Sequence, residues 1–197
     1  MKEVNGLHKS FGKVKVLNGI HLEYHPGKIY GLVGENGAGK TTLFNCMTGI
    51  YNYTGSITKS KTLKAGYLSA SNFFYSQITG LEYLEFCMKA KGLPVSTLTI
   101  QHLNEIFQLP LDRYAAEYST GMKKKLGFMA LLLQDNDVFI LDEPFNGVDL
   151  KGCILMKRLI RQLKAKEKTV IISSHLIASL REICDIIHYL NEGVIYK

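Results

Sequence analysis

The sequence lacks the paired cysteines and the long apolar runs that are typical of disulfide-bonded secreted proteins, structural zinc sites and membrane-spanning proteins. Its four cysteines are scattered and form no C-x-x-C pair, which argues against a zinc site or disulfide framework and favours reduced thiols in a cytosol. No apolar run reaches membrane-spanning length, and the first dozen residues lack the apolar stretch of a signal peptide. We therefore expect any membrane association to pass through a partner or the protein surface.

The sequence also lacks repeats, low-complexity tracts and linkers, so its 197 residues predict one substantial domain with room for a small subdomain. Hydrophobic residues make up 46% of the chain, enough for a packed core. Lysine and arginine outnumber aspartate and glutamate by 24 to 17, a formal net charge of +7. This surplus favours an anionic neighbour (nucleotide, nucleic acid or lipid headgroup) without choosing among them.

Apolar runs rich in β-formers alternate with helical patterns along the chain, which predicts an α/β fold with a sheet that is parallel at its centre. The main strands are expected at 28–34, 137–144 and 169–175, and a hairpin near the end of the chain turns at 191–193. Shorter strands are predicted at Val14–Leu17, Ile20–Tyr24, Gly55–Thr58 and Leu63–Leu68. Helices are predicted at Lys40–Gly49, Leu81–Lys91, Ile100–Phe107, Gly121–Leu133 and Leu150–Lys166, with Thr79, Thr99 and Asp149 as caps.

A glycine-rich loop carries the most specific motif. The segment Gly34–Thr41, GENGAGKT, fits G-x-x-x-x-G-K-[ST] and lies between a predicted strand and a predicted helix. Its glycines let consecutive amides point at phosphate oxygens beside the positive end of a helix. We expect Lys40 to reach the β- and γ-phosphates and the Thr41 hydroxyl to bind Mg²⁺; the alternative is a glycine-rich turn that carries a lysine by chance.

Two acidic residues end a second apolar strand, and their position complements the loop. Asp142 is placed to help hold Mg²⁺, and Glu143 beside it can polarise a water for attack on the γ-phosphate. Alone, such a pair reads as two exposed acids at a strand end. Together with the glycine-rich loop it predicts an ATP or GTP site.

The order of these motifs resembles the nucleotide-binding subunits of ABC transporters over essentially the whole chain. GENGAGKTT matches their Walker A, VFILDEP their Walker B, Asn146–Asp149 (NGVD) their D-loop and Ser173–His175 (SSH) their switch histidine. The resemblance implies a P-loop NTPase of ABC type, with an antiparallel β portion and a helical subdomain (about 79–133) inserted into a nucleotide-binding core (about 1–78 and 134–197). It also implies a Mg²⁺-dependent ATPase whose cofactors are ATP and Mg²⁺.

The resemblance assigns the site residue by residue. The residues implied to bind the nucleotide are Phe11, Gly34, Glu35, Asn36, Gly37, Ala38, Gly39, Lys40, Thr41 and Thr42. Those implied to act in catalysis are Lys40, Glu143 and His175, and the implied metal ligands are Thr41 and Asp142. Phe11, placed by the sequence in a loop after the first segment, corresponds to the aromatic that stacks on adenine; the alternative for it is core packing.

The segment Tyr118–Met122 (YSTGM) stands where the family carries the signature usually written L-S-G-G-Q. By resemblance, two subunits pack head to tail, and each signature covers the nucleotide held by its partner. The signature residues are Ser119, Thr120, Gly121 and Met122, with Asp149 in the D-loop. The lysines at 123–125 would then lie in the first helical turn, where cations oppose the helix dipole, so they form either a solvated face or a surface that faces an anion.

One position departs from the family pattern. The glutamine that normally follows the GYL strand is Ala70 here, which puts the metal and coupling role of that loop in doubt. The aromatics Phe73, Phe74 and Tyr75 follow it, beside the loop that meets the membrane subunit in transporters. They are expected either to contact that subunit, so that polar replacements at Phe73 and Phe74 uncouple transport, or to form the core of the helical segment.

The resemblance implies an ATP-hydrolysing subunit that drives a separate permease, closest in motif style to bacterial exporters of the drug, antibiotic or bacteriocin-immunity type. Such a subunit would be cytoplasmic and peripheral on the inner face of the membrane. No nucleic-acid partner is expected, because the lysines lack interleaved aromatics and no DNA- or RNA-binding module is recognisable. The alternatives are a non-transport ATPase in DNA repair or ribosome work, and a nucleotide-gated subunit with little turnover.

Overall fold

The computed structural model describes residues 3–58, 60, 62–71 and 73–196. The strands are β1 (Glu3–Phe11), β2 (Val14–Glu23), β3 (Ile29–Val33), β4 (Thr54–Thr58), β5 (Ala65–Leu68), β6 (Val138–Leu141), β7 (Thr169–Ser174), β8 (Ile186–Asn191) and β9 (Val194–Tyr196). The helices are α1 (Lys40–Thr48), α2 (Gly80–Ala90), α3 (Thr97–Phe107), α4 (Thr120–Leu133), α5 (Leu150–Ala165) and α6 (Ile177–Arg181), with a 3₁₀ turn, η1, at Ala115–Glu117. In the part of the chain so described, none of the helices has the length and apolar character needed to cross a membrane.

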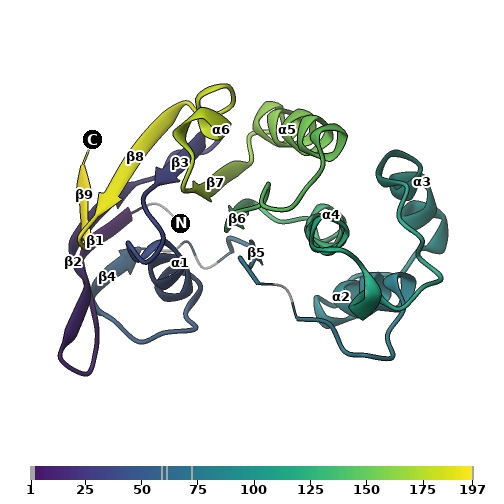
Figure 1. Ribbon diagram of the computed structural model, residues 1–197, viewed down its shortest axis with the longest axis horizontal. Coiled ribbons are helices and arrows are strands. Elements are labelled where there is room, and N and C mark those ends of the chain that lie inside the picture. The colour runs from purple at the N-terminus through teal and green to yellow at the C-terminus, as the bar shows by residue number, and fades with distance from the viewer. Residues whose placement is uncertain (1–2, 59, 61, 72, 197) are drawn as a thin grey trace.

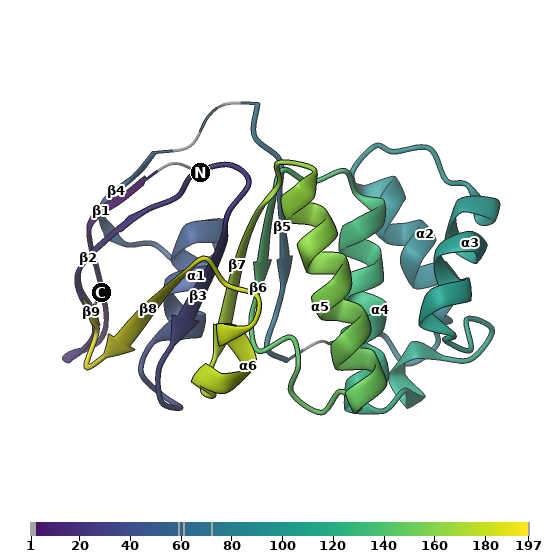
Figure 2. The same ribbon diagram turned by 90° about the horizontal axis from the view of Figure 1, so that it is seen from above.

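The strands form two sheets (Figures 1 and 2). The larger has the order β5-β6-β7-β3-β8-β9, and its strands are parallel except for β9, which returns beside β8 as a hairpin. The smaller, β2-β1-β4, is antiparallel. These pairings confirm the predicted α/β class with a mainly parallel core sheet and an antiparallel portion.

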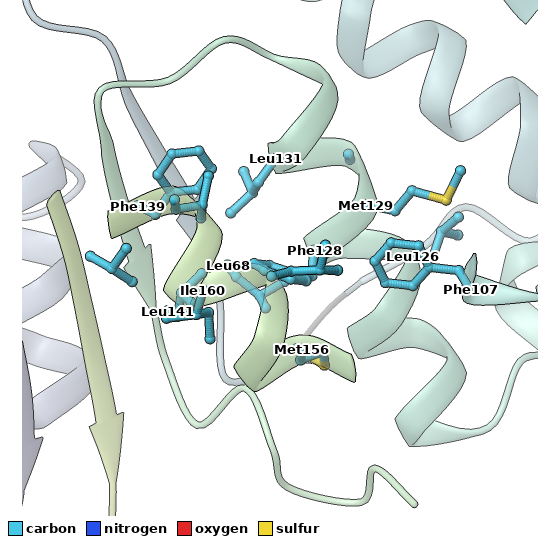
Figure 3. Close-up of a cluster of buried hydrophobic side chains, with 14 of the residues drawn as sticks. Leu68, Phe107, Leu126, Phe128, Met129, Leu131, Phe139, Leu141, Met156 and Ile160 are labelled. Atoms are coloured by element: carbon cyan, nitrogen blue, oxygen red, sulfur yellow. The ribbon is translucent and has the colours of Figure 1, made fainter. Parts of the chain in front are cut away.

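Helix α1 lies between the two sheets, and α4 and α5 cover the opposite face of the larger one (Figures 1 and 2). Strands such as β3 and β6 are buried on both sides, so their residues alternate between two cores: Phe139 and Leu141 face α4 and α5, whereas Ile140 faces α1. Figure 3 shows the core beneath α4 and α5, where Phe128 and Met156 meet the sheet residues. This packing fixes the carboxyl ends of β3, β5, β6 and β7 at one edge of the sheet.

The segment between β5 and β6 holds α2, α3 and α4. Thr79 begins α2 with a capping box, in which its hydroxyl accepts the Glu82 N–H and the Glu82 carboxylate accepts the Thr79 N–H. Helix α4 lies between the sheet and the helices α2 and α3 (Figure 2), and one hydrophobic core includes side chains from all of them. The division of the chain at residues 79 and 133 stays a prediction.

Several local predictions were wrong in detail. The strands expected at 14–17 and 20–24 are one strand, β2, because Asn18 and Gly19 form a bulge opposite His8, with Gly19 at a φ of 68°. Ser96, not Thr99, caps α3, and its hydroxyl accepts the Thr99 N–H. Phe11 is the last residue of β1 rather than a loop residue.

Candidate active site

The glycine-rich loop follows the buried strand β3 and leads directly into α1. Gly34 lies so close to the next segment that a Cβ atom on it would come within 2.4 Å of the Leu190 carbonyl oxygen. Gly39, at the N-cap position of α1, has a φ of 103°, which an L side chain rarely adopts. The loop is therefore held by backbone approaches that require glycine, and it places the N-terminus of α1 where an anion is stabilised.

Lys40 folds over this loop. Its side chain is 6% exposed, and its ammonium donates hydrogen bonds to the carbonyl oxygens of Gly34 (2.7 Å) and Glu35 (3.0 Å). It also lies 3.5 Å from the carboxylate of Glu143. The lysine thus joins the loop to the end of β6. Its predicted contact with the phosphates of a nucleotide stays a prediction.

The carboxylate of Asp142, fully buried, collects three hydroxyl donors from three elements. It accepts the Thr41 hydroxyl at 2.6 Å, the Ser173 hydroxyl and, at 3.4 Å, the Tyr67 hydroxyl. The oxygens of Thr41 and Asp142 suit Mg²⁺, which prefers oxygen ligands and usually keeps several waters. Among the described residues no group of three or more His, Cys, Asp or Glu side chains could hold a metal alone, so phosphate oxygens and waters would have to complete its shell.

Glu143 is held in an unusual conformation. Its φ of 47° is left-handed, a strain found at functional sites, and its N–H donates to the Ser173 hydroxyl at 2.9 Å. One carboxylate oxygen, Oε2, lies 3.1 Å from Nδ1 of His175, which stands one residue beyond β7. The other, Oε1, is buried and is the oxygen that lies 3.5 Å from the Lys40 ammonium; it accepts no hydrogen bond from the residues that the structure describes.

These side chains surround one cavity of about 340 Å³. It is lined by Asn36, Gly37, Gly39, Lys40, Thr41, Thr42, Ala70, Glu143, Asn146 and His175. The fold thus brings the phosphate loop together with Glu143 and His175, which lie more than a hundred residues farther along the chain. Glu35 and Ala38, also assigned to the nucleotide, belong to the same loop but do not line this cavity.

Comparisons with known proteins agree with this geometry. A model of the family described as ABC transporter matches residues 17–146. The bacitracin transport ATP-binding protein BcrA of Enterococcus faecalis is 35% identical over 97% of this chain, and the lantibiotic transport ATP-binding protein SrtF of Streptococcus pyogenes is 31% identical over 99% of it. The chain belongs to the ABC transporter family, as an ATP-binding subunit.

The extent of the matches differs among relatives. The aligned region spans 66% of the bacitracin transport protein and 89% of the lantibiotic transport protein. A solved structure of an ATP-binding subunit of an ABC transporter superposes with a TM-score of 0.89 at 25% identity, over 99% of this chain and 88% of the other. The likeness therefore covers the helices between β5 and β6 as well as the sheets.

The ABC signature lies apart from this cavity. Ser119 is the N-cap of α4, and its hydroxyl accepts the Met122 N–H at 3.3 Å. Gly121 is buried against the D-loop, where a Cβ atom would come within 2.4 Å of the Gly147 carbonyl oxygen. No residue from 119 to 122 lines the cavity at the chain's own phosphate loop.

Phe11 and the aromatics after Ala70 divide into exposed and buried side chains. Phe11 is 46% exposed, contacts the Tyr51 ring edge-on and does not line the cavity, so its role with adenine stays a prediction. Phe73 is 80% exposed, whereas Phe74 is 8% exposed and packs against Tyr83 in the core. Of the two alternatives for this stretch, the core alternative thus describes Phe74.

The three lysines after the signature do not form a single face. Lys124 is 2% exposed, and its ammonium donates to the carbonyl oxygens of Ser69 and Asp142. Burial lowers the pKa of Lys124 to about 8. Lys125 forms an ion pair with the Asp149 carboxylate at 2.7 Å, and this contact lowers the pKa of Asp149. Asp149 occupies the N-cap position of α5, but its side chain makes no capping hydrogen bond, contrary to the prediction.

Sequence reasoning missed three contributors: Ser173, Tyr67 and Lys124. Ser173 is the last residue but one of β7, and the polar end of that apolar run, TVIISSH, was a signal that the sequence offered. Lys124 falls three residues after Gly121 and four before Phe128, a helical spacing that puts it on the buried face of α4. Tyr67 carries no comparable signal in the sequence.

Proposed function

We propose that this chain is a Mg²⁺-dependent ATPase that energises a separate membrane permease, working in the direction of export. The observation that carries the proposal is the convergence of Lys40, Glu143 and His175 on the cavity beside the Thr41–Asp142 pair. Each of these groups has a distinct task in cleaving the γ-phosphate of ATP.

Lys40 is placed to exchange partners when ATP binds. Its ammonium now bonds two loop carbonyls and lies near Glu143, which are contacts that a phosphate oxygen can replace with stronger charge-assisted bonds. The amides of the loop and the N-terminus of α1 would bind the remaining phosphate oxygens. Movement of Lys40 toward phosphate also leaves the Glu143 carboxylate available to a water.

Glu143 is the proposed general base. Its carboxylate orients the water whose oxygen attacks the γ-phosphorus; the bond to the ADP oxygen breaks, and the water proton passes to Glu143. The histidine ring at 3.1 Å steadies the carboxylate and can donate toward the γ-phosphate. A bound Mg²⁺, held by Thr41 and Asp142, would neutralise charge on the phosphates.

The separation of the signature from the cavity supports a shared site. Ser119 begins α4, so its hydroxyl and the first amides of the helix lie where a partner subunit's γ-phosphate would be stabilised. We propose a head-to-tail dimer in which Thr120, Gly121 and Met122 complete the partner's site. Asp149 of the D-loop would then lie at the interface between the two subunits. The arrangement requires residues 79–133 to act as a subdomain.

The proposal of export rests on the names of the relatives, which are ATP-binding proteins for bacitracin and lantibiotic transport. The exposed rings of Phe73 and Tyr75, in edge contact at 5.5 Å, supply an apolar surface for a permease. The subunit would then be peripheral on the cytoplasmic face of the membrane.

Replacement of Glu143 tests the proposed hydrolysis. Glu143→Gln should keep ATP binding and lower steady-state phosphate release about 10²-fold or more, as expected for loss of a general base. It should also favour an ATP-bound dimer on size-exclusion chromatography. Glu105→Gln, an exposed carboxylate on α3, is the matched control and should leave turnover unchanged.

A subunit that binds ATP with little turnover is the second candidate, and Ala70 favours it. This residue lines the cavity at the position where the family pattern has a glutamine, so one side-chain oxygen for the metal would be missing. The same assay decides: wild-type phosphate release no faster than that of Glu143→Gln supports this candidate and contradicts the ATPase proposal.

A further inference from the structure

Lys124 is a buried cation that the proposed chemistry does not use. It lies on α4, five residues after the signature serine, and α4 runs beside β5 (Figure 2). Its ammonium donates to the Ser69 carbonyl at 2.8 Å and to the Asp142 carbonyl at 3.1 Å. A buried lysine is costly unless its charge and donors are satisfied, so this arrangement calls for a reason.

The two carbonyls belong to neighbouring strand ends. Leu68 of β5 pairs with Leu141 of β6, and the N–H of Asp142 donates to the Leu68 carbonyl at 2.8 Å. Ser69 and Asp142 are the next residues on each strand, where the ladder stops and the two chains diverge. Lys124 therefore joins the strands just beyond their last backbone hydrogen bond.

Both joined residues lead into the cavity. Asp142 carries the carboxylate that accepts the Thr41 hydroxyl, and Ser69 precedes Ala70, which lines the cavity. The helix that carries Lys124 also begins at the signature, because Ser119 is the N-cap of α4. A displacement of α4 would therefore move the Lys124 ammonium, and through its hydrogen bonds the end of β6 at Asp142 and the loop after β5 at Ser69.

We propose that Lys124 is a positioning residue, which couples the signature helix to the Asp142 carboxylate by holding the strand ends of β5 and β6 together. The inference rests on the proposed Mg²⁺-dependent function. Because outer-shell partners of metal ligands change metal affinity or activity by about 10- to 100-fold, an effect of that size is expected here.

The test compares ATP binding with and without metal. Lys124→Met keeps most of the side-chain length and removes every donor, and Lys124→Arg keeps the charge and the donors. Lys91→Met is the matched control, because Lys91 donates to the Ala65 carbonyl at the opposite end of β5. For each variant, the ATP dissociation constant is measured in EDTA and in excess Mg²⁺, together with phosphate release and a urea unfolding curve.

We expect Lys124→Met to bind ATP in EDTA like the wild type while its gain in affinity on adding Mg²⁺, and its turnover, fall by about tenfold or more. Lys124→Arg should recover most of both, and Lys91→Met should match the wild type. An unchanged or larger Mg²⁺ gain in Lys124→Met, or an equal loss of affinity in EDTA, overturns the proposal and leaves Lys124 a structural residue only.

Two further arms keep the result interpretable. If Lys124→Met does not fold, Lys124→Leu, which likewise removes every donor, takes its place; a wild-type Mg²⁺ response in it likewise overturns the proposal. If the wild type itself shows neither a Mg²⁺ gain nor phosphate release, the proposed function fails and this inference falls with it. A normal wild type with an unaffected variant contradicts the inference alone.

Discussion

Phe73 and Phe74 are neighbours of one residue type whose replacement by alanine should differ sharply in cost. Phe74 is 8% exposed and contacts the Tyr83 ring at 4.8 Å, whereas Phe73 is 80% exposed. A buried phenylalanine removes on the order of 150 Å² from water, which at about 25 cal/mol per Å² amounts to about 4 kcal/mol. Phe73, with about a fifth of that burial, should contribute less than about 1 kcal/mol.

The measurement is urea unfolding of Phe73→Ala and Phe74→Ala beside the wild type. Phe74→Ala should lower the midpoint by roughly 1–2 M, and Phe73→Ala should shift it little, with similar slopes for all three proteins. Equal losses of stability in the two variants would refute the assignment of Phe74 to the core and Phe73 to the surface.

The same pair separates folding from coupling. Phe73→Ser should leave the stability and basal ATP hydrolysis of the isolated subunit unchanged and reduce turnover stimulated by the permease, if the exposed ring docks there. A polar replacement at Phe74 does not report on coupling alone, because the loss of core packing lowers the folded fraction first. Stimulation that survives Phe73→Ser would remove this ring from the permease contact.

Three other outcomes are expected. Mixing Ser119→Arg with Lys40→Ala subunits should restore phosphate release, since each heterodimer would keep one intact shared site; no activity despite proven heterodimers would exclude that arrangement. Ala70→Gln should change the Mg²⁺ dependence of hydrolysis only modestly, because a water can fill the vacant position on Mg²⁺; a large gain in turnover would show that the alanine limits the enzyme. The pKa of Asp137 lies below its ordinary 3.8, because its carboxylate accepts a backbone N–H and a lysine ammonium. Such a group stabilises the fold above its unfolded-state pKa and loses that effect as the pH falls through the lowered folded value. Because the Asp137 side chain is 44% exposed and water screens its ion pair, Asp137→Asn should cost less than about 1 kcal/mol at pH 7, with the difference shrinking in acid; a cost independent of pH would contradict the cause given.

Local patterns in the sequence determined the phosphate loop and much of the element order. Gly34, Lys40 and Thr41 lie within a few residues of one another between a strand and a helix, so spacing and backbone torsions alone predicted their arrangement. The position of Asp142 and Glu143 at the end of a strand could also be predicted from the sequence, because a short apolar run that stops at two acidic residues favours a buried strand. Recognition of the family extended this local reading to the signature and the histidine.

Only the tertiary structure decided which distant groups meet. Thr41 and Asp142 are 101 residues apart, Lys124 and Ser69 are 55 apart, and Ser173 and Asp142 are 31 apart, yet each pair is hydrogen-bonded. These contacts follow from the strand order β5-β6-β7-β3, which sets the carboxyl ends of the four strands side by side. A run of lysines or of aromatics has the same composition whether a side chain turns inward or outward. Burial of Lys124 and Phe74 therefore depended on the packing of α4 against that sheet and of α2 against α4.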